Sequence, residues 1–549
     1  MPAEVRGLRP ISEWLDICES RSSAFFRLLE KIYGQTGSEI ESSAHSCSRT
    51  LAAFTEAYGR NRDVIVVRSA GRINLLGMHI DHRGGAVNPI AIKELFMVAS
   101  PRRDDTVQVR NVENRAFPNE TFRVRDCLPD HKIADWDAWC HDALEQRKND
   151  HSVTWSNYVR APILYLQHLN TSSDGSFQPR LVGMDTMFYG RVPRSAGLSS
   201  SSSIVVATAE ACLRINGIEL DSMDFVDLCG YGEWYVGTRG GAGDHAAIKL
   251  SRPNATSHIT SFPLAFSSSP FPEGYRIVLA NSLVEANKRE GARDIFNNRV
   301  ASYVFGSLLI EKEYPELSGR IEHFRDLTPE NLGVDEAVVY QLLRSLPHSA
   351  NRKDLRRLLP DKSAELEHVF RSHAEPPEGY RIRQVCTFGV CECLRSEMAS
   401  ERLQNKDVVG FGELLNVSHD GDRVSRLIEG VSRPVHKDYS DQTLDGLMRD
   451  VNSSDETRRE RARLWRQPGG YDVSVPQADA LVDIALAARG VVGARLVGAG
   501  LGGSILALVQ EKKTESLLHK LEQEYYAPRH LPVSAEVVRP VGGSGVLEI

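Results

Sequence analysis

The sequence predicts an α+β fold for this chain of 549 residues. Helical and strand patterns are mixed along the whole chain, and the strands lack the regular succession of helices that parallel βαβ winding requires. No internal repeat is visible. A chain of this length is long enough for two or three domains, each with its own core.

The first part of the chain begins with predicted helices and continues with predicted strands. Residues 10–60 carry apolar side chains at spacings of three and four, which is typical of amphipathic helices. Runs rich in β-branched residues then predict strands at 63–71, 86–92, 94–101, 106–111 and 121–126. The polar segment from about 126 to 152 is interpreted as an insertion.

The rest of the chain continues this mixture. Helices are expected at 155–169 and 203–217, the second closed by Asn216-Gly217, and strands at 181–194 and 276–283. Residues 285–465 are charge-rich and mostly helical in pattern. Residues 493–510 read as strand, glycine loop and strand.

Composition and charge restrict the class of protein. The chain has 66 basic and 73 acidic residues, a net charge of −7, which argues against a nucleic-acid surface. The N-terminal residues lack the apolar core of a signal peptide, and no apolar run has the length of a membrane helix. Nine scattered cysteines fit a reducing compartment, and Cys386, Cys391 and Cys393 are interpreted as buried free thiols rather than zinc ligands. We therefore expect a cytoplasmic protein without nucleic-acid or membrane partners.

The most informative segment is GRINLLGMHIDHRGG, from Gly71 to Gly85. It follows the apolar run at 64–67 and places Arg72, His79, Asp81 and His82 in one loop. Polar clusters are costly to bury without partners, and loops on rigid strands commonly carry binding sites. The alternative is a charged turn that caps a strand.

A second segment, PRSAGLSSSSSIVVATAEA, runs from Pro193 to Ala209. Five consecutive serines lead directly into a predicted helix, whose free N–H groups and dipole favour an anion such as phosphate. The segment lacks the Gly-Lys-Ser/Thr ending of a Walker loop. A serine-rich linker before a capped helix is the alternative.

Two further segments have weaker signals. GAGLGGS, from Gly498 to Ser504, lies between two apolar runs. A glycine loop alone is weak evidence for a binding site, and this one counts only together with the first two motifs. Asp244 follows a glycine-rich turn and fits a general base or electrostatic anchor, with helix capping as the alternative. Glu233 is expected to end a helix.

Taken together, these segments resemble the galactokinase branch of the GHMP kinases. GRINLLGMHIDHRGG is similar to the galactokinase signature, close to GRVNLIGEHTDYNGG, and PRSAGLSSSSS resembles the serine-rich phosphate motif. GARLVGAGLGGSILALV resembles the third motif, while WSNYVRA and YDVSVPQADALVDIA resemble shorter segments of the family. The motifs follow the family's order from about residue 64 onward.

The resemblance implies a two-domain GHMP kinase fold with the active site between the domains. The expected divisions are an N-terminal helical extension at 1–60, an N-terminal kinase domain at 61–265 and a C-terminal kinase domain at 266–549. It also implies transfer of the γ-phosphoryl group of ATP to the anomeric hydroxyl of a sugar, with Mg²⁺ as cofactor.

The resemblance also assigns roles to individual positions. Arg72 and Asp244 would be the catalytic pair, and Glu233 and Ser201 the magnesium ligands, although Glu233 lies one residue closer to Asp244 than in galactokinases. Trp155 and Tyr158 would lie near the nucleotide, with packing as an equal explanation. The remaining positions are the sugar-binding Met78, His79, Asp81, Gly243 and Phe296, the phosphate-binding Pro193, Gly197, Leu198, Ser199, Ser200, Ser201, Ser202 and Ser203, and the third-motif Gly498, Gly500, Gly502 and Gly503.

Departures from the galactokinase pattern leave the sugar open. Met78 replaces a glutamate that holds the C6 hydroxyl, and Phe296 replaces a tyrosine near the sugar. The chain has GGAGDH where galactokinases have roughly CGIMDQ. Arg239, just before this segment, and His245, at its end, are new relative to the family pattern. MHIDHRGG resembles the AHIDHQGG segment of plant galacturonokinases. Galactose, galacturonate and L-arabinose all stay open as substrates. The family's glutamate would repel the carboxylate of a uronate, and Met78 removes that repulsion. A pentose lacks C6 and would also tolerate Met78.

Two other functions are weighed. A non-catalytic relative that senses a sugar would keep the fold and lose part of the phosphate loop, whereas Arg72, Asp244 and the serine loop are all present here. A GHMP kinase for another small alcohol, such as a heptose, fits the HIDHRGG segment poorly.

Overall fold

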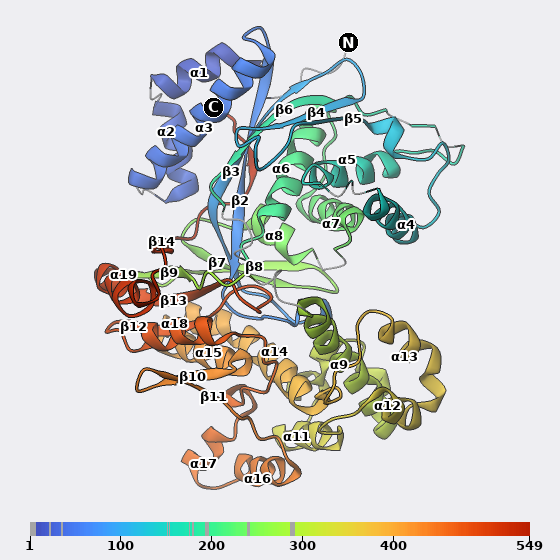
Figure 1. Ribbon diagram of the computed structural model, residues 1–549, viewed down its shortest axis with the longest axis vertical. Helices are drawn as coiled ribbons and strands as arrows, with labels where there is room; N and C mark the ends of the chain where they lie inside the picture. The colour runs from blue at the N-terminus through green and yellow to red at the C-terminus, as the bar shows by residue number, and fades with distance from the viewer. Residues whose placement is uncertain are drawn as a thin grey trace.

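The computed structural model describes residues 7–20, 23–34, 37–150, 152, 154–174, 176–177, 180–192, 197–238, 242–285 and 291–549, without the side chains of residues 23, 292, 293 and 318. Two halves are stacked along the long axis, with the N-terminal half uppermost in Figure 1. Each half is built around its own β-sheet.

The N-terminal half contains a sheet of seven strands among the described residues, in the order β1-β2-β3-β6-β4-β5, with β15 also paired to β2. The β4–β6 pair is parallel and the other pairs are antiparallel. The strands are β1 (Arg9–Pro10), β2 (Asp63–Asn74), β3 (Pro89–Pro101), β4 (Thr106–Asn111), β5 (Glu120–Arg123), β6 (Met184–Gly190) and β15 (Gly545–Val546).

Helices cover both faces of this sheet (Figure 1). On β2, Val64 and Val66 pack with the N-terminal helices, whereas Ile65 and Val67 pack with the helices of the opposite face. A strand buried on both faces reads as a continuous apolar run, which explains the run at 64–67. One layer is α1 (Ile11–Glu19), α2 (Ser23–Tyr33) and α3 (Gly37–Tyr58), and the other is α4 (Trp136–Asn149), α5 (Asn157–Leu169), α6 (Ser200–Ile215), α7 (Ser222–Glu233) and α8 (Gly243–Leu250).

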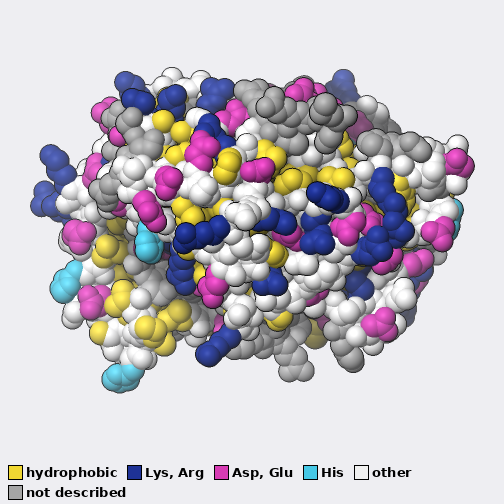
Figure 2. Space-filling view, turned by 90° about the horizontal axis from the view of Figure 1, so that it is seen from above, with side chains coloured by type: hydrophobic (Ala, Val, Ile, Leu, Met, Phe, Trp, Pro, Cys, Tyr) yellow, Lys and Arg dark blue, Asp and Glu magenta, His cyan; other side chains and the backbone are white. Residues whose placement is uncertain are grey.

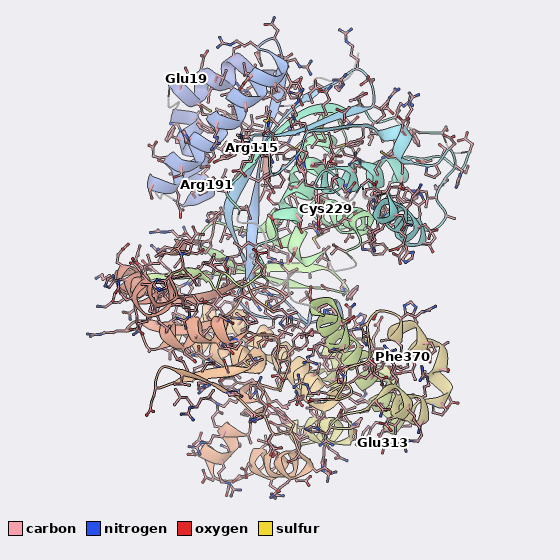
Figure 3. The ribbon with its side chains drawn as sticks, in the orientation of Figure 1. Glu19, Arg115, Arg191, Cys229, Glu313 and Phe370 are labelled. Atoms are coloured by element: carbon pink, nitrogen blue, oxygen red, sulfur yellow. The ribbon has the colours of Figure 1, made fainter. Side chains whose placement is uncertain are left out.

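A polar contact fastens the N-terminal helices to the sheet. Glu94, fully buried on β3, accepts hydrogen bonds from Tyr33 Oη of α2 at 2.9 Å and from Arg191 Nε at 2.5 Å. Figure 3 shows Arg191 beside these helices, whereas Cys229 lies on the other side of the sheet within α7. The predicted helical segment at 10–60 is therefore a layer of the N-terminal half.

The C-terminal half contains an antiparallel sheet in the order β12-β13-β9-β14. Its strands are β9 (Tyr275–Asn281), β12 (Val491–Leu496), β13 (Ser504–Gln510) and β14 (Ala535–Val538), and two hairpins are formed by β7 (Ala255–Thr260) with β8 (Ala265–Pro270) and by β10 (Ser425–Ile428) with β11 (Val431–Pro434).

Helices make up most of this half. They are α9 (Ala292–Glu313), α10 (Pro329–Leu332), α11 (Glu336–Ser345), α12 (Arg352–Leu358), α13 (Ser363–Phe370), α14 (Ile382–Gln404), α15 (Val408–Asp422), α16 (Asp441–Val451), α17 (Glu456–Arg461), α18 (Pro476–Leu486) and α19 (Thr514–Leu521).

An apolar cluster joins the two halves. Ile73 and Ile90, at the ends of β2 and β3 nearest the C-terminal half, pack in one core with Leu506 of β13 and with Leu403 and Leu414 of α14 and α15. Apolar surface buried in this way stabilises a fixed arrangement of the halves. The residues that follow β2 are thereby held against the C-terminal half.

Most predicted elements are present, with some differences. The two strands expected at 86–92 and 94–101 form one continuous β3, which passes through Lys93 with a positive φ of 50°. Within the segment at 126–152, α4 packs Trp136 against the neighbouring helices. The helix expected from His245 begins at Gly243, so Asp244 lies inside its first turn rather than at the cap. The expected domain boundary at 265 falls within the β7–β8 hairpin.

The outer face of the N-terminal half carries charges of both signs. Seen from above, lysine and arginine side chains are interspersed with aspartate and glutamate (Figure 2). Within the described parts of the chain, no helix combines the length and the apolar character needed to cross a bilayer.

Candidate active site

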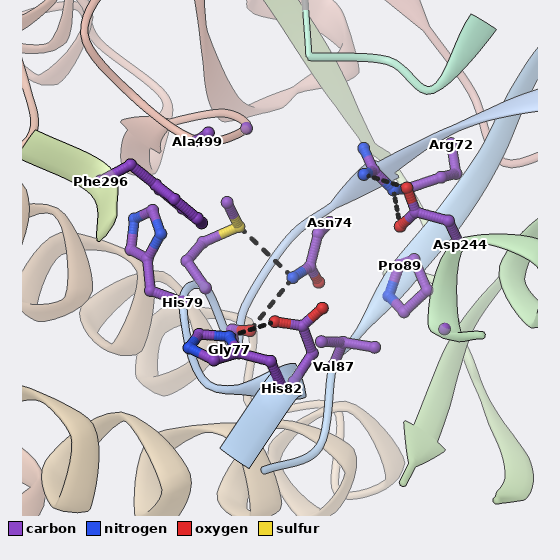
Figure 4. A pocket seen from close by; sticks show the side chains of 14 residues that line it. Arg72, Asn74, Gly77, His79, His82, Val87, Pro89, Asp244, Phe296 and Ala499 are labelled. Carbon is purple, nitrogen blue, oxygen red and sulfur yellow. Dashed lines mark hydrogen bonds and ion pairs between the residues drawn. The ribbon is translucent and has the colours of Figure 1, made fainter. Parts of the chain in front are cut away.

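A cavity of about 170 Å³ opens where β2 ends, between the two halves of the chain. Figure 4 shows it with side chains from β2, the loop that follows β2, α8, α9 and the loop after β12. Its size suits a small ligand, below the range of pockets that hold drug-sized molecules. The lining residues are Arg72, Asn74, Gly77, Met78, His79, Asp81, His82, Val87, Pro89, Gly243, Asp244, Phe296, Gly498 and Ala499.

Arg72 and Asp244, 172 positions apart in the sequence, form a bidentate ion pair at one end of the cavity. Arg72 Nε donates to Asp244 Oδ1 at 2.6 Å and Nη2 donates to Oδ2 at 2.7 Å (Figure 4). Two parallel charge-assisted hydrogen bonds fix both the distance and the orientation of such a pair. The Asp244 side chain is still 37% exposed, so a ligand in the cavity can reach it.

The surroundings of Asp244 favour its ionised form. Burial opposes ionisation, but the Arg72 charge and hydrogen bonds from Arg72 and Ser199 lower the pKa of Asp244 below its ordinary value. Ser199 Oγ donates to Asp244 Oδ2 at 2.6 Å. Asp244 is therefore a carboxylate at neutral pH and a weak base.

The serine loop, whose described residues before α6 are 197–199, lies beside the Arg72–Asp244 pair. Arg72 Nη1 donates to the carbonyl oxygen of Gly197 at 2.7 Å, and the Arg72 backbone N–H donates to Leu198 at 3.1 Å. Ser199 then precedes α6 in a left-handed conformation without a side-chain cap on the helix. The first N–H groups of α6 thus lack a capping side chain and form the kind of site that binds anions. Pro193 of this motif lies outside the described residues, as does Arg239.

The third-motif loop lies directly against the serine loop. A Cβ atom placed on Gly197 would come within 3.1 Å of the Cα atom of Gly498, and one on Gly498 within 3.0 Å of Gly197 Cα. Both glycines have positive φ angles, 75° and 78°. Residues with side chains could not form this contact without displacing backbone. The loop continues through Gly500, Gly502 and Gly503, which also have positive φ.

Glu233 lies at the end of α7, as expected, and its role as a metal ligand stays a prediction. Its carboxylate oxygens lie 3.4 Å from Ser202 Oγ and its Oε2 lies 2.9 Å from His245 Nε2. Ser201, the serine expected to hold a metal together with Glu233, lies beside the Tyr158 side chain. Ser202 is thus the serine beside Glu233. Among the described residues, no group of three or more His, Cys, Asp or Glu side chains is placed to hold a metal ion.

The predicted sugar-binding residues lie around the cavity but have different surroundings. Met78 is nearly buried, and its sulfur accepts a hydrogen bond from Asn74 Nδ2 at 3.3 Å. His79 stacks on Tyr471 with 4.1 Å between ring centroids. Phe296 lies beside His79 in Figure 4, at the end of the cavity away from Arg72 and Asp244.

Asp81 is the more exposed of the predicted polar sugar contacts, with 41% of its side chain accessible. His82 Nδ1 lies 3.3 Å from its Oδ1. Burial raises the pKa of the Asp81 carboxyl, but the hydrogen bond and the charge of His82 outweigh it and lower the pKa to about 2. Asp81 therefore offers a charged acceptor to hydroxyl groups in the cavity.

Trp155 and Tyr158 flank the start of α5. Trp155 packs edge-on against Phe117 and Phe188, and its Nε1 donates to Pro118 at 2.8 Å. Tyr158 reaches Ser201 on α6. Packing accounts for Trp155, whereas Tyr158 touches the serine motif.

Sequence reasoning missed some of the residues at this site. Asn74 lies in the quoted signature but was given no role, although it lines the cavity and hydrogen-bonds Met78. Glu392 lies outside the cavity lining but accepts hydrogen bonds from the backbone N–H groups of Gly77 and Met78, and it was missed within an apolar, cysteine-containing stretch. The signal that could have singled it out is a glutamate three residues before Arg395 within the mostly apolar run at 385–394, because buried charges require partners.

Three family descriptions match separate parts of the chain. The galactokinase galactose-binding signature matches residues 52–101, the GHMP kinases N terminal domain matches 157–252 and the GHMP kinases C terminal matches 447–527. The first covers Arg72 and the loop at 75–85 that follows β2, and the second covers the serine motif and Asp244.

Whole-chain comparisons agree with these matches. The chain is 25% identical to a galactokinase of Schizosaccharomyces pombe over 530 residues, covering 91% of this chain and 95% of the relative. It is also 25% identical to a galactokinase of Streptococcus thermophilus, covering 91% and 99%. Lactococcus lactis galactokinase complexed with galactose has a similar fold, with a TM-score of 0.60, 21% identity and coverage of 92% and 99%.

The same order of motifs, the matched domains and the shared fold support one conclusion. The family's enzymes transfer a phosphoryl group from ATP to an alcohol acceptor. The chain belongs to the GHMP kinase superfamily, in its galactokinase branch.

Proposed function

We propose that this protein is an ATP-dependent sugar 1-kinase that phosphorylates the anomeric hydroxyl of galactose or of a galactose-like sugar. The observation that carries the proposal is the contact of Arg72, Asp244 and the serine loop at one end of a cavity of about 170 Å³. Phosphoryl transfer depends mainly on positioning and on stabilisation of charge, and these three elements supply both.

In the proposed reaction, Asp244 accepts a hydrogen bond from the anomeric hydroxyl of the sugar. The hydroxyl oxygen forms a bond to the γ-phosphorus while the bond to the β-phosphate oxygen breaks and ADP leaves. The proton of the hydroxyl passes to Asp244. A carboxylate with a lowered pKa is a weak base, which suits a loose transition state in which orientation matters more than early proton removal.

Arg72 has two tasks in this proposal. Its bidentate bonds hold the Asp244 carboxylate in one orientation, and its third hydrogen bond, to Gly197, holds the serine loop next to the reacting oxygen. Its positive charge also offsets the negative charge of the transferred group. The uncapped N-terminus of α6 would bind the phosphates of ATP.

The residues near Glu233 fit a magnesium ion that arrives with ATP. One carboxylate and the hydroxyls of Ser201 and Ser202 are hard oxygen donors, and Mg²⁺ in such sites completes its shell with phosphate oxygens and water. When bound, the ion would neutralise charge on the phosphates. We assign Glu233 and Ser202 to it, together with the expected Ser201.

The wall of the cavity at Met78 and Phe296 bears on which sugar is bound. Both side chains are apolar at positions where galactokinases carry a carboxylate and a phenol, so neither offers the hydrogen bonds of those groups. Galacturonate and L-arabinose therefore remain proposed substrates beside galactose.

A sugar panel tests the proposal directly. Purified protein with MgATP is assayed for ADP release with galactose, galacturonate, L-arabinose and a heptose, and the product is analysed for phosphate at C1. We expect turnover with at least one of the first three sugars. Turnover with none of them would overturn the proposal, and turnover with the heptose alone would favour another GHMP kinase activity.

Asp244→Asn tests the catalytic assignment. The amide keeps the size of the side chain but removes its charge and its capacity to take a proton, so kcat should fall by about 10²- to 10⁴-fold. Circular dichroism and the urea midpoint of the variant check that the fold is kept. Turnover at the wild-type rate would rule out the proposed role.

A further inference from the structure

Glu392 of α14 belongs to the C-terminal half but contacts the sugar-binding loop of the N-terminal half. Its side chain is fully buried, and its Oε1 accepts hydrogen bonds from the backbone N–H groups of Gly77 at 2.9 Å and Met78 at 3.1 Å. Both of these residues line the cavity. A carboxylate that accepts two successive amides fixes the direction of the backbone between them.

Glu392 is itself held in place on several sides. Arg395 Nε donates to its Oε2 at 2.8 Å, Ser418 Oγ donates to Oε1 at 2.8 Å, and Arg495 Nη1 lies 3.4 Å from Oε1. Burial opposes ionisation, but the charges of Arg395 and Arg495 keep the pKa of Glu392 below its ordinary value. The two arginines and Ser418 are also buried, so the carboxylate has little freedom to move.

The same network reaches the next residue of the loop. Arg495 Nη2 lies 3.6 Å from Asp422 Oδ2, and Asp422 Oδ1 lies 3.3 Å from His79 Nε2. The carboxylates of Glu392 and Asp422 are thus balanced by the guanidinium groups of Arg395 and Arg495. A buried network of matched charges holds one geometry, because moving any member leaves another unpaired.

A second contact from α14 fixes the other end of the loop. Ser396, one turn after Glu392, donates through Oγ to the carbonyl oxygen of Ala86. Asn88 Nδ2 in turn donates to Ser396 Oγ at 2.8 Å and to its carbonyl oxygen at 3.0 Å. One face of α14 therefore holds the sugar loop at both ends.

We propose that Glu392 is a positioning residue for sugar binding, which sets the backbone of Gly77 and Met78 at the cavity wall. The inference rests on the proposed sugar kinase function and deepens it. Glu392 lies outside the cavity lining, so it acts only through the loop. It makes the geometry of the sugar site depend on the C-terminal half.

Glu392→Asp tests this inference. The shorter side chain keeps the charge between Arg395 and Arg495 but withdraws its oxygens from the loop amides. We expect the KM for the sugar to rise about 10-fold, the value for one lost hydrogen bond to a charged group, while the KM for ATP stays within about 2-fold of wild type. Hydrogen exchange of a peptide spanning residues 75–80 should become faster.

Glu94→Asp is the matched control. Glu94 is equally buried and is also paired with an arginine, Arg191, but it lies away from the cavity. We expect this variant to lose stability without raising the sugar KM. An unchanged sugar KM in Glu392→Asp, or an equal rise in Glu94→Asp, would overturn the inference.

Ser418→Ala provides a milder change if Glu392→Asp does not fold. It removes one hydrogen bond that orients Glu392 and should raise the sugar KM in the same direction by a smaller factor. No effect on the sugar KM would count against the inference. Absence of turnover by the wild-type protein would instead overturn the proposed function, and the inference with it, whereas the exchange of the 75–80 peptide reports the loop contact separately.

Discussion

At the residue scale, Met78 is the position most directly linked to the choice of sugar. Its side chain lies at the cavity wall, within hydrogen-bond distance of Asn74 Nδ2 through its sulfur. The sulfur is a weak acceptor, so Asn74 has a donor that a stronger acceptor could use. A carboxylate introduced at position 78 would have this partner available.

Met78→Glu should therefore favour a sugar with a C6 hydroxymethyl group over a uronate. The new carboxylate accepts a hydrogen bond from the hydroxyl and repels the carboxylate of the uronate. We expect the ratio of kcat/KM for galactose to that for galacturonate to rise about 10-fold or more. Steady-state kinetics with both sugars measure the ratio.

Met78→Leu is the control for this change, since it keeps an apolar side chain of similar volume. The ratio should stay near its wild-type value in this variant. An equal change of the ratio in the leucine and glutamate variants would show that packing, rather than charge, governs discrimination at this position.

At the element scale, the serine loop and the third-motif loop come into direct backbone contact although they lie about 300 residues apart in the sequence. Gly197 and Gly498 lie back to back, and both have positive φ. Gly498→Ala adds a Cβ atom 3.0 Å from the Cα atom of Gly197 and strains the backbone by about 1–2 kcal/mol. Since relief requires the serine loop to move away, the KM for ATP should rise severalfold.

Gly217→Ala separates the effect of backbone strain from the effect of the contact between the two loops. Gly217 follows α6, also has a positive φ, and a Cβ atom there would meet no atom within 4 Å. The variant carries a similar backbone strain without a clash and should lose stability while keeping its KM for ATP. Equal ATP KM values in the two variants would contradict the importance of the loop contact.

Elements whose signal is local could be predicted from the sequence. The helix α6 and the β12–loop–β13 unit agree with their patterns because apolar periodicity and glycine positions are set within a few residues. The continuity of β3 through Lys93 was not predicted, because the charged pair Lys93-Glu94 between two apolar runs resembles a break. Pairing on both sides keeps this strand continuous.

The candidate site could likewise be predicted only in part from the sequence. Arg72 and Asp244 were singled out as a catalytic pair through the family motifs, and the structure places them in direct contact. Their roles stay predictions. Ser201 was assigned as a metal ligand together with Glu233, and this role stays a prediction, while the helix places Ser202 Oγ 3.4 Å from the same carboxylate. A difference of one position rotates a helical side chain by about 100°, which sequence spacing alone cannot resolve in a run of identical serines.

At the scale of the whole molecule, the two ends of the chain meet on the N-terminal sheet. β15 pairs with β2, and the C-terminus lies beside α3 (Figure 1). Arg68, almost fully buried on β2, donates through Nη1 to the carbonyl oxygens of Gly542 at 2.6 Å and Gly543 at 3.1 Å. The last residues therefore complete the N-terminal half, although they follow the C-terminal half in sequence.

Removal of residues 540–549 should destabilise the protein strongly. The buried side chains of Val541 and Leu547 are lost, each contributing about 1.5–3 kcal/mol, and Arg68 loses buried acceptors at a further cost of about 1–3 kcal/mol. The sum is comparable with the whole stability of a typical domain. Urea unfolding followed by circular dichroism should show a much lower midpoint, or the truncated protein should aggregate.

Two single variants divide this effect. Leu547→Ala removes only apolar contact and should cost about 2–5 kcal/mol. Glu548→Ala removes a partly exposed ion pair with Arg214 and should cost less than about 1 kcal/mol. A truncated protein that unfolds at the wild-type urea midpoint would show that the last ten residues do not support the sheet. A loss confined to Leu547→Ala would assign the contribution of these two side chains to packing, rather than to the ion pair with Arg214.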